Sequence, residues 1–180
     1  MIFTPLPLTG AFEVLLEPRK DARGFFSRFY CEDEFSQHGL NTDWVQMNLS
    51  LTRGRGSLRG LHFQRGAAAE VKLVRCLRGR VYDVIVDLRE GSTSYGRHVG
   101  VELDAERRNS IYIPEGFAHG FQTLEDEAEL QYFHSKPYSP GHEGGVNLMD
   151  NDLAIDWPLP PAQMSERDEN LPPFKEVLPL

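Results

Sequence analysis

Cysteine is scarce in this chain of 180 residues, which contains only Cys31 and Cys76. A chain of this length can bury a sizeable core without disulfides, so we expect both thiols to be reduced, with a single disulfide as the minor alternative. No apolar run approaches the roughly 18 residues that a membrane helix needs. The first ten residues, MIFTPLPLTG, lack the basic and apolar segments of a signal peptide. These absences predict a soluble, cytoplasmic protein with no membrane partner.

An excess of positive charge is also missing. The formal net charge is −8 at pH 7, whereas a protein that binds nucleic acid needs a basic face for the phosphates. We therefore expect no nucleic-acid partner. A small anionic ligand stays compatible with this charge, because it needs only a local cluster of arginines.

Strong helical patterns are rare, and most of the chain has the short alternating patterns of β-strands. The segment 71–88, VKLVRCLRGRVYDVIVDL, contains two strands joined near Arg78-Gly79-Arg80. Short strands at this spacing indicate one all-β domain, a sandwich or barrel, rather than alternating βαβ units. Further strands are predicted at 11–16, 44–49, 58–64, 98–103, 110–113, 118–123 and 129–134.

Two short helices and a proline-rich tail complete the expected fold. Helices are predicted at 32–38 and at 165–170, the second with Ser165 as its N-cap. The segment 158–180 contains six of the twelve prolines, and such a segment cannot join a central strand. We expect this tail to wrap the surface or to cover an opening.

The stretch LRGLHFQ at 58–64 places a histidine inside a predicted strand. His62 and Gln64 share one face of that strand. If this face lines the interior of a barrel, the interior is polar, which a packing core would avoid. Arg59 joins the same face only if a bulge forms at Gly60, and glycine permits one. The alternative is a structural strand histidine.

Four further side chains are candidates for chemistry, and each has a structural alternative. Lys72 would either stabilise a developing oxyanion or extend from the end of its strand. Asp83, on the next strand, is expected near Lys72, where a structural ion pair would explain both residues as well as catalysis does. Tyr132 would act as a proton donor or as an amphipathic residue at the sheet rim. Asp168 lies in a charged cluster, where a solvated acid is the simpler interpretation.

A second histidine, His119 in YIPEGFAHGFQ, raises the possibility of a metal site. His62, His119 and Glu70 could form a facial triad. Sandwich folds that bind metals typically carry a His-x-His pair, and here Gln64 stands where the second histidine would be. We therefore expect no metal, with the triad as the alternative.

These motifs together resemble the dTDP-4-dehydrorhamnose 3,5-epimerases, which are metal-independent cupins. The pair RGLHFQ and PEGFAHGF is the most specific match, and the resemblance spans essentially the whole chain in order. The matching stretches are DARGFF at 21–26, Gln46 with Asn48 and Ser50, GSLRGLHFQ at 56–64, VKLVR at 71–75, VYDVIVDLREGS at 81–92, YIPEGFAHGF at 112–121, LQY at 130–132, YSPGHE at 138–143, LAIDWPL at 153–159 and SERD at 165–168.

The resemblance implies an all-β cupin-type jelly roll, a sandwich or barrel with short helices and a wrapping C-terminal tail. It implies a single domain over 1–180, in which 1–25 is a strand-exchange arm and 158–180 the proline-rich tail. The expected partners are a nucleotide-sugar substrate and a second copy of the chain in a homodimer. Neither a cofactor nor a metal is expected.

Individual roles also follow from the resemblance. His62 would remove a proton from the carbon beside a sugar ketone, and Asp168 would orient and charge-stabilise its ring. Tyr132 would deliver a proton from the opposite face, and Lys72 would stabilise the enolate oxygen. Tyr138 would stack on the nucleotide base, and Arg23 would serve the site of the partner subunit. The full set of implied substrate-binding positions is Arg23, Gln46, Asn48, Arg59, His119, Tyr138, Glu143 and Arg167.

The favoured reaction is epimerisation at carbons 3 and 5 of dTDP-4-keto-6-deoxyglucose to give dTDP-4-dehydrorhamnose. Departures from the family pattern leave the substrate open, because Arg28 and Glu70 replace a usual glutamate and glutamine, and Gln122 stands where an apolar residue is common. One alternative is an epimerase of carbon 3 alone, or a related isomerase, on a nucleotide 4-keto-deoxysugar. Others are a metal-dependent cupin oxygenase and a non-catalytic module that binds sugar nucleotides.

Overall fold

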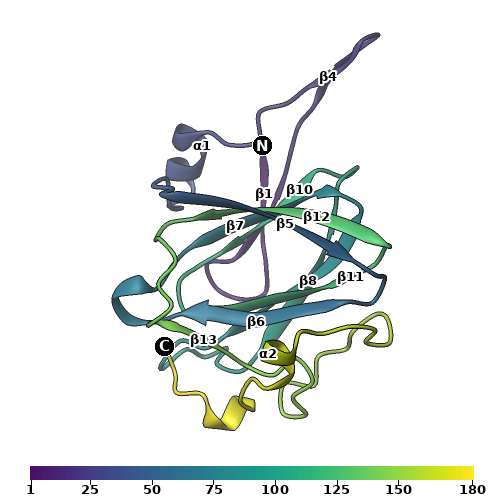
Figure 1. Ribbon diagram of the computed structural model, residues 1–180. Coiled ribbons are helices and arrows are strands. Elements are labelled where there is room, and N and C mark those ends of the chain that lie inside the picture. Colours follow the sequence, from purple (N-terminus) through teal and green to yellow (C-terminus); the bar gives the residue numbers. More distant parts are fainter.

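The computed structural model describes all 180 residues, and its core consists of two antiparallel sheets packed face to face (Figure 1). The larger sheet has six strands, in the order β1 (Ile2–Pro5), β2 (Phe12–Leu15), β10 (Asn109–Ile113), β7 (Lys72–Arg78), β12 (Glu127–His134) and β5 (Gln46–Arg53). The smaller sheet has five, in the order β13 (Glu143–Gly145), β6 (Leu58–Gln64), β11 (Phe117–Thr123), β8 (Arg80–Asp87) and β9 (His98–Asp104).

The alternation of side chains along each strand separates the space between the sheets from their outer faces. On β8, Val81 and Ile85 pack into the cluster of apolar residues between the sheets. Val84 and Val86, on the other face of β8, pack into a second cluster outside the smaller sheet. Both faces of β8 are therefore buried, which explains why its sequence is a nearly continuous apolar run.

The C-terminal tail contributes to the second cluster, below the smaller sheet in Figure 1. Val177 is buried there, and the backbone N–H of Leu180 donates to the carbonyl of Leu88 at 2.7 Å. Within this tail lies α2 (Glu166–Glu169), whose N-cap Ser165 accepts a hydrogen bond from the N–H of Asp168. The prediction that the tail wraps the surface is confirmed, as is the cap.

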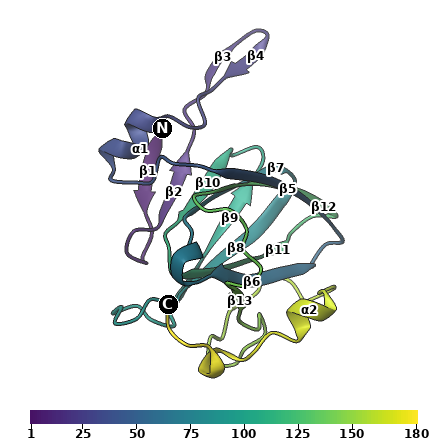
Figure 2. The same ribbon diagram turned by 60° about the vertical axis from the view of Figure 1, so that its left-hand side comes forward.

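The N-terminal segment contributes two strands to the larger sheet and then forms a hairpin outside both sheets. Strands β1 and β2 pair with each other, and β2 pairs with β10 of the same chain. The hairpin of β3 (Arg19–Asp21) and β4 (Gly24–Phe26) projects away from both sheets (Figure 2). A short helix, α1 (Glu32–Gln37), follows and buries Phe35 against the outer side of the larger sheet.

The predicted strands all form, and β6 matches its predicted bounds of 58–64. Four short strands, β1, β3, β4 and β13, were not predicted, because segments of three or four residues are too short to show a period. Both cysteines are free thiols. None of the helices has the length and apolarity needed to span a membrane.

Candidate active site

A cavity of about 1050 Å³ opens between the two sheets, bounded by β5, β7 and β12 on one side and by β6, β11 and the tail on the other. This volume is suited to a ligand larger than a simple sugar. Of the twelve site residues expected from the sequence, ten line it: His62, Tyr132, Asp168, Lys72, Asn48, Arg59, His119, Tyr138, Glu143 and Arg167. Gln46 lies at the rim, where its side-chain oxygen accepts from the backbone N–H of Tyr138 at 3.0 Å.

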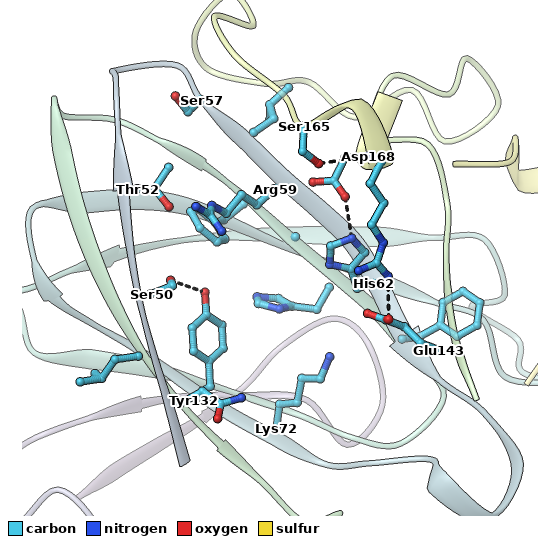
Figure 3. A pocket seen from close by; sticks show the side chains of 18 of the residues that line it. Ser50, Thr52, Ser57, Arg59, His62, Lys72, Tyr132, Glu143, Ser165 and Asp168 are labelled. Carbon is cyan, nitrogen blue, oxygen red and sulfur yellow. Dashed lines mark hydrogen bonds and ion pairs between the residues drawn. The ribbon is translucent and has the colours of Figure 1, made fainter. Parts of the chain in front are cut away.

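His62 enters the cavity from β6, and its ring is held by Asp168 (Figure 3). The His62 Nε2 to Asp168 Oδ1 distance is 2.7 Å. Burial would raise the pKa of Asp168, but hydrogen bonds from His62 and from the Gly60 N–H more than offset it and leave the pKa lowered. Asp168 is thus a carboxylate that can only accept, so Nε2 carries the proton and Nδ1 is left as the basic nitrogen.

A bulge in β6 brings Arg59 to the same cavity. His119 of β11 pairs with His62, whereas Phe121, two residues on, pairs with Arg59, three residues back, so β6 has one extra residue. Gly60 has φ +115, and a Cβ there would lie 2.6 Å from the His119 carbonyl oxygen and the Gly120 Cα. Only glycine fits at this position. The predicted bulge at Gly60 is confirmed.

Tyr132 points into the cavity from β12 in the opposite sheet (Figure 3). Its hydroxyl lies 3.0 Å from the hydroxyl of Ser50 on β5. Burial raises the pKa of Tyr132 to about 12, so the phenol is protonated at neutral pH and is able to donate a proton. The imidazole of His62 and this phenol therefore approach one space from two sides.

Lys72 lies in the same cavity, but its partner differs from the expected one. Its Nζ is 3.3 Å from Glu70 Oε1, whereas Asp83 bonds Nε2 of His119 at 2.8 Å. Lys72 lies near Asp83, as expected, but the two form no direct ion pair. Burial raises the pKa of Asp83, against the opposing effects of His119 and of the charge on Lys72.

His134 is among the cavity residues that sequence reasoning missed. Its Nδ1 lies 2.8 Å from Glu70 Oε2, and its ring stacks on that of Tyr132 with an interplanar angle of 20°. A signal was available, because His134 follows Tyr132 by two positions and so shares its strand face.

Tyr138, Glu143 and Arg167 form a hydrogen-bonded cluster at the rim of the cavity. Glu143 accepts a hydrogen bond from the Tyr138 hydroxyl at 2.8 Å and pairs with Arg167 at 2.7 Å. With Arg53 and Arg59 also lining the cavity, the mouth of the cavity holds three arginines in a protein of net charge −8. These arginines form the local cluster that an anionic ligand requires.

Two positions from the sequence analysis lie outside this cavity. Arg23 is at the tip of the projecting hairpin and pairs with Asp21 at 2.6 Å. Arg28 pairs with Glu34 at 2.8 Å, next to α1. The structure does not bring either arginine to the cavity of its own chain.

The members of the possible metal triad are each bonded to different partners. His62 contacts Asp168, His119 contacts Asp83, and Glu70 contacts both His134 and Lys72. No group of three or more His, Cys, Asp or Glu side chains is arranged to hold a metal ion.

The arrangement is suited to moving a proton between the two faces of a bound molecule. A base and an acid on opposite sides can remove a proton from one face and replace it on the other. A lysine beside them can stabilise negative charge that develops on an oxygen in between.

The chain is similar over nearly its whole length to proteins of known function. Residues 5–176 match the family model described as dTDP-4-dehydrorhamnose 3,5-epimerase. The chain is 43% identical over 177 residues to an enzyme of that name from Methanothermobacter thermautotrophicus, covering 97% of this chain and 95% of the relative. It is 42% identical over 171 residues to a dTDP-4-dehydrorhamnose 3-epimerase from Streptomyces niveus, covering 94% and 82%.

A solved structure gives the same result for the fold. The dTDP-6-deoxy-D-glucose-3,5-epimerase from Legionella pneumophila, in complex with dTDP-4-keto-L-rhamnose, superposes with a TM-score of 0.91 at 35% identity. The match covers 99% of this chain and 97% of the other. The expected all-β jelly-roll fold is thereby confirmed.

Proposed function

Because this chain belongs to the dTDP-4-dehydrorhamnose 3,5-epimerase family, we propose that it inverts carbons 3 and 5 of dTDP-4-keto-6-deoxyglucose to give dTDP-4-dehydrorhamnose. It is an isomerase. The observation that carries the proposal is the placement of His62 and Tyr132, which reach one cavity from opposite sheets with Lys72 beside them (Figure 3).

The first step is removal of a proton by Nδ1 of His62. Carbons 3 and 5 both adjoin the ketone at carbon 4, so the electrons of the broken C–H bond move to the ketone oxygen and form an enolate. The ammonium group of Lys72 stabilises that oxygen. Asp168 stabilises the imidazolium that results, because its carboxylate stays bonded to Nε2.

The second step is protonation of the same carbon from the other side. The Tyr132 hydroxyl gives its proton to the carbon as the enolate returns to the ketone. Inversion needs this second group, because His62 alone would return the proton to the face it came from. With its pKa raised to about 12 by burial, Tyr132 holds its proton until the enolate forms.

The arginine-rich mouth accommodates the nucleotide diphosphate. Arg59 and Arg167 would contact the phosphates, since guanidinium groups pair well with phosphate oxygens. Tyr138 is 54% exposed at the rim, where its ring is free to stack on the base. Gln46, Asn48, His119 and Glu143 would complete the contacts with the ligand.

Epimerisation of carbon 3 alone is the second candidate. A relative with that name, from Streptomyces niveus, is as similar to this chain as the double epimerase from Methanothermobacter thermautotrophicus. The same acid and base would serve it, with only one carbon reaching Tyr132.

Solvent labelling separates the two candidates. Incubation of dTDP-4-keto-6-deoxyglucose with the protein in heavy water is expected to place deuterium at both carbon 3 and carbon 5, detected by NMR and mass spectrometry. A sample without protein measures spontaneous exchange. Label at carbon 3 alone would select the mono-epimerase, and no label above background would favour a module that only binds the sugar nucleotide.

We also propose a homodimer in which the β3–β4 hairpin is the exchanged part of the N-terminal arm. Phe25 and Phe26 on the hairpin are 51% and 76% exposed, and Met47 and Leu49 along the edge strand β5 are 60% and 62% exposed. Exposed apolar residues on an unpaired sheet edge favour association. In such a dimer the projecting hairpin carries Arg23 toward the cavity of the partner.

The dimer predicts a solution mass of about 41 kDa by light scattering, twice the 20.5 kDa of one chain. Leu49→Glu is expected to lower this mass to that of a monomer, because a charge would be buried in the interface. Leu178→Glu, at a leucine in the tail that is 70% exposed, serves as the control and should stay dimeric. An unchanged protein of 20.5 kDa would contradict the proposal.

A further inference from the structure

The cavity contains a third histidine–carboxylate pair that the proposed reaction does not use. Glu70 precedes β7, and His134 on β12 stands directly opposite Lys72 in the sheet. The three side chains are almost completely buried, with exposures of 7% for Glu70, 12% for His134 and 11% for Lys72. They form a compact group at the end of the cavity where the lysine lies.

Glu70 is shared unequally between its two neighbours. Oε2 lies 2.8 Å from His134 Nδ1, and Oε1 lies 3.3 Å from Lys72 Nζ. An ammonium–carboxylate hydrogen bond at full strength is about 2.7–2.9 Å long. The histidine therefore has the tighter hold on this carboxylate, and the lysine is only loosely engaged.

The negative charge of Glu70 determines how strongly it can attract Lys72. Burial would raise the pKa of Glu70, but the hydrogen bond from His134 and the charge of Lys72 outweigh burial and leave the pKa lowered. Glu70 is thus an anion beside the one cation that faces the enolate oxygen. A carboxylate that closed on Lys72 would compete with the substrate for its charge.

The hydrogen bonds of His134 also fix which nitrogen carries its proton. The Asn48 side-chain oxygen already accepts from Gln46 at 3.2 Å, so the Asn48 Nδ2 faces His134 Nε2 at 3.3 Å as a donor. Nε2 must then accept, and Nδ1 carries the hydrogen that it donates to Glu70. The Nδ1–H of His134 therefore points at the carboxylate of Glu70.

We infer that His134 is a positioning residue for the epimerase reaction, one that holds Glu70 away from Lys72 and so keeps the ammonium group available to the ketone oxygen. This inference rests on the proposed function and adds a residue to it. In this role His134 acts through Glu70 and not on the reacting atoms themselves.

Two substitutions isolate the Nδ1 hydrogen bond. His134→Leu removes the donor, whereas His134→Asn places an amide N–H near the position of Nδ1 and retains it. Both remove Nε2 and its contact with Asn48, so they differ in the contact with Glu70. We expect His134→Leu to lower kcat about 10- to 100-fold with KM within about twofold, and His134→Asn to stay near the unchanged protein. The loss is smaller than the about 10²–10³-fold for deleting an oxyanion donor outright, because Lys72 is still present.

Adding Glu70→Gln to His134→Leu is expected to restore most of the lost kcat, because the neutral amide no longer attracts the lysine. A purely structural role for His134 would not be rescued in this way. A crystal structure of His134→Leu, which requires no activity, is expected to show the Lys72–Glu70 distance shortened from 3.3 Å to about 2.8 Å.

Each outcome has a distinct meaning. An unchanged kcat in His134→Leu, or a loss that Glu70→Gln does not rescue, would overturn the inference, as would an unchanged Lys72–Glu70 distance. Failure of the unchanged protein to exchange deuterium into the keto sugar would instead count against the proposed function, and the crystal structure would still report on the position of Lys72.

Discussion

Replacement of His62 by alanine is expected to lower kcat by about 10²–10⁴-fold, the usual contribution of a general base. Binding of the nucleotide should change little, because the arginines at the mouth of the cavity are untouched. Steady-state kinetics with the keto sugar and calorimetric titration with dTDP measure the two effects separately. A loss confined to kcat identifies a group that acts in the transition state rather than in binding.

A second variant, His62→Gln, distinguishes loss of the base from loss of the folded structure. His62→Gln places an amide N–H near the position of Nε2, so it retains a donor for the buried Asp168 but has no basic nitrogen. It should be as inactive as His62→Ala and closer to the unchanged protein in thermal stability. His98→Ala, on β9 outside the cavity, is the matched control and should keep full activity. Full activity in His62→Gln would remove His62 from the mechanism.

Replacement of Tyr132 by phenylalanine is expected to separate proton exchange from inversion. His62 can still remove a proton and return a solvent deuteron to the same face, so exchange into the substrate in heavy water should stay within about tenfold of the unchanged protein. Formation of the inverted product should fall by about 10²–10⁴-fold, because no acid remains on the other face. NMR of the sugar protons follows both quantities in one sample.

The control for this variant is Tyr30→Phe, since the Tyr30 hydroxyl donates to the Thr42 carbonyl away from the cavity. It should retain both exchange and inversion. If Tyr132→Phe lost exchange and inversion to the same extent, Tyr132 would be needed for enolate formation itself. If inversion persisted at the normal rate, another group in the cavity would be the acid.

Local sequence patterns were sufficient for much of the fold. The alternation in 58–64 gave β6 with its bounds, and the β-branched run in 71–88 gave β7 and β8. The glycine before Leu61 located the bulge, because a close approach to the neighbouring strand admits no Cβ. Such features depend on neighbours in the chain, and they are therefore visible in one sequence.

Partners distant in sequence were beyond those patterns. Asp168 reaches His62 across 106 residues, and on its own segment it is one acid in a charged cluster. Lys72 was expected near Asp83, but its ion pair is with Glu70, because the strand order places β12 next to β7 and brings His134, with Glu70, to the lysine. The contact of His62 with Asp168 and that of Lys72 with Glu70 cannot be predicted from the periodicity of a single strand.

The sequence by itself determined the strands, the faces of those strands that carry polar side chains, and the family to which the chain belongs. Only the tertiary structure decided which polar faces meet across the cavity and which carboxylate each cation or imidazole contacts. The physical reason is that alternation is a property of one strand, whereas a hydrogen bond between strands depends on sheet order, register and the path of the tail.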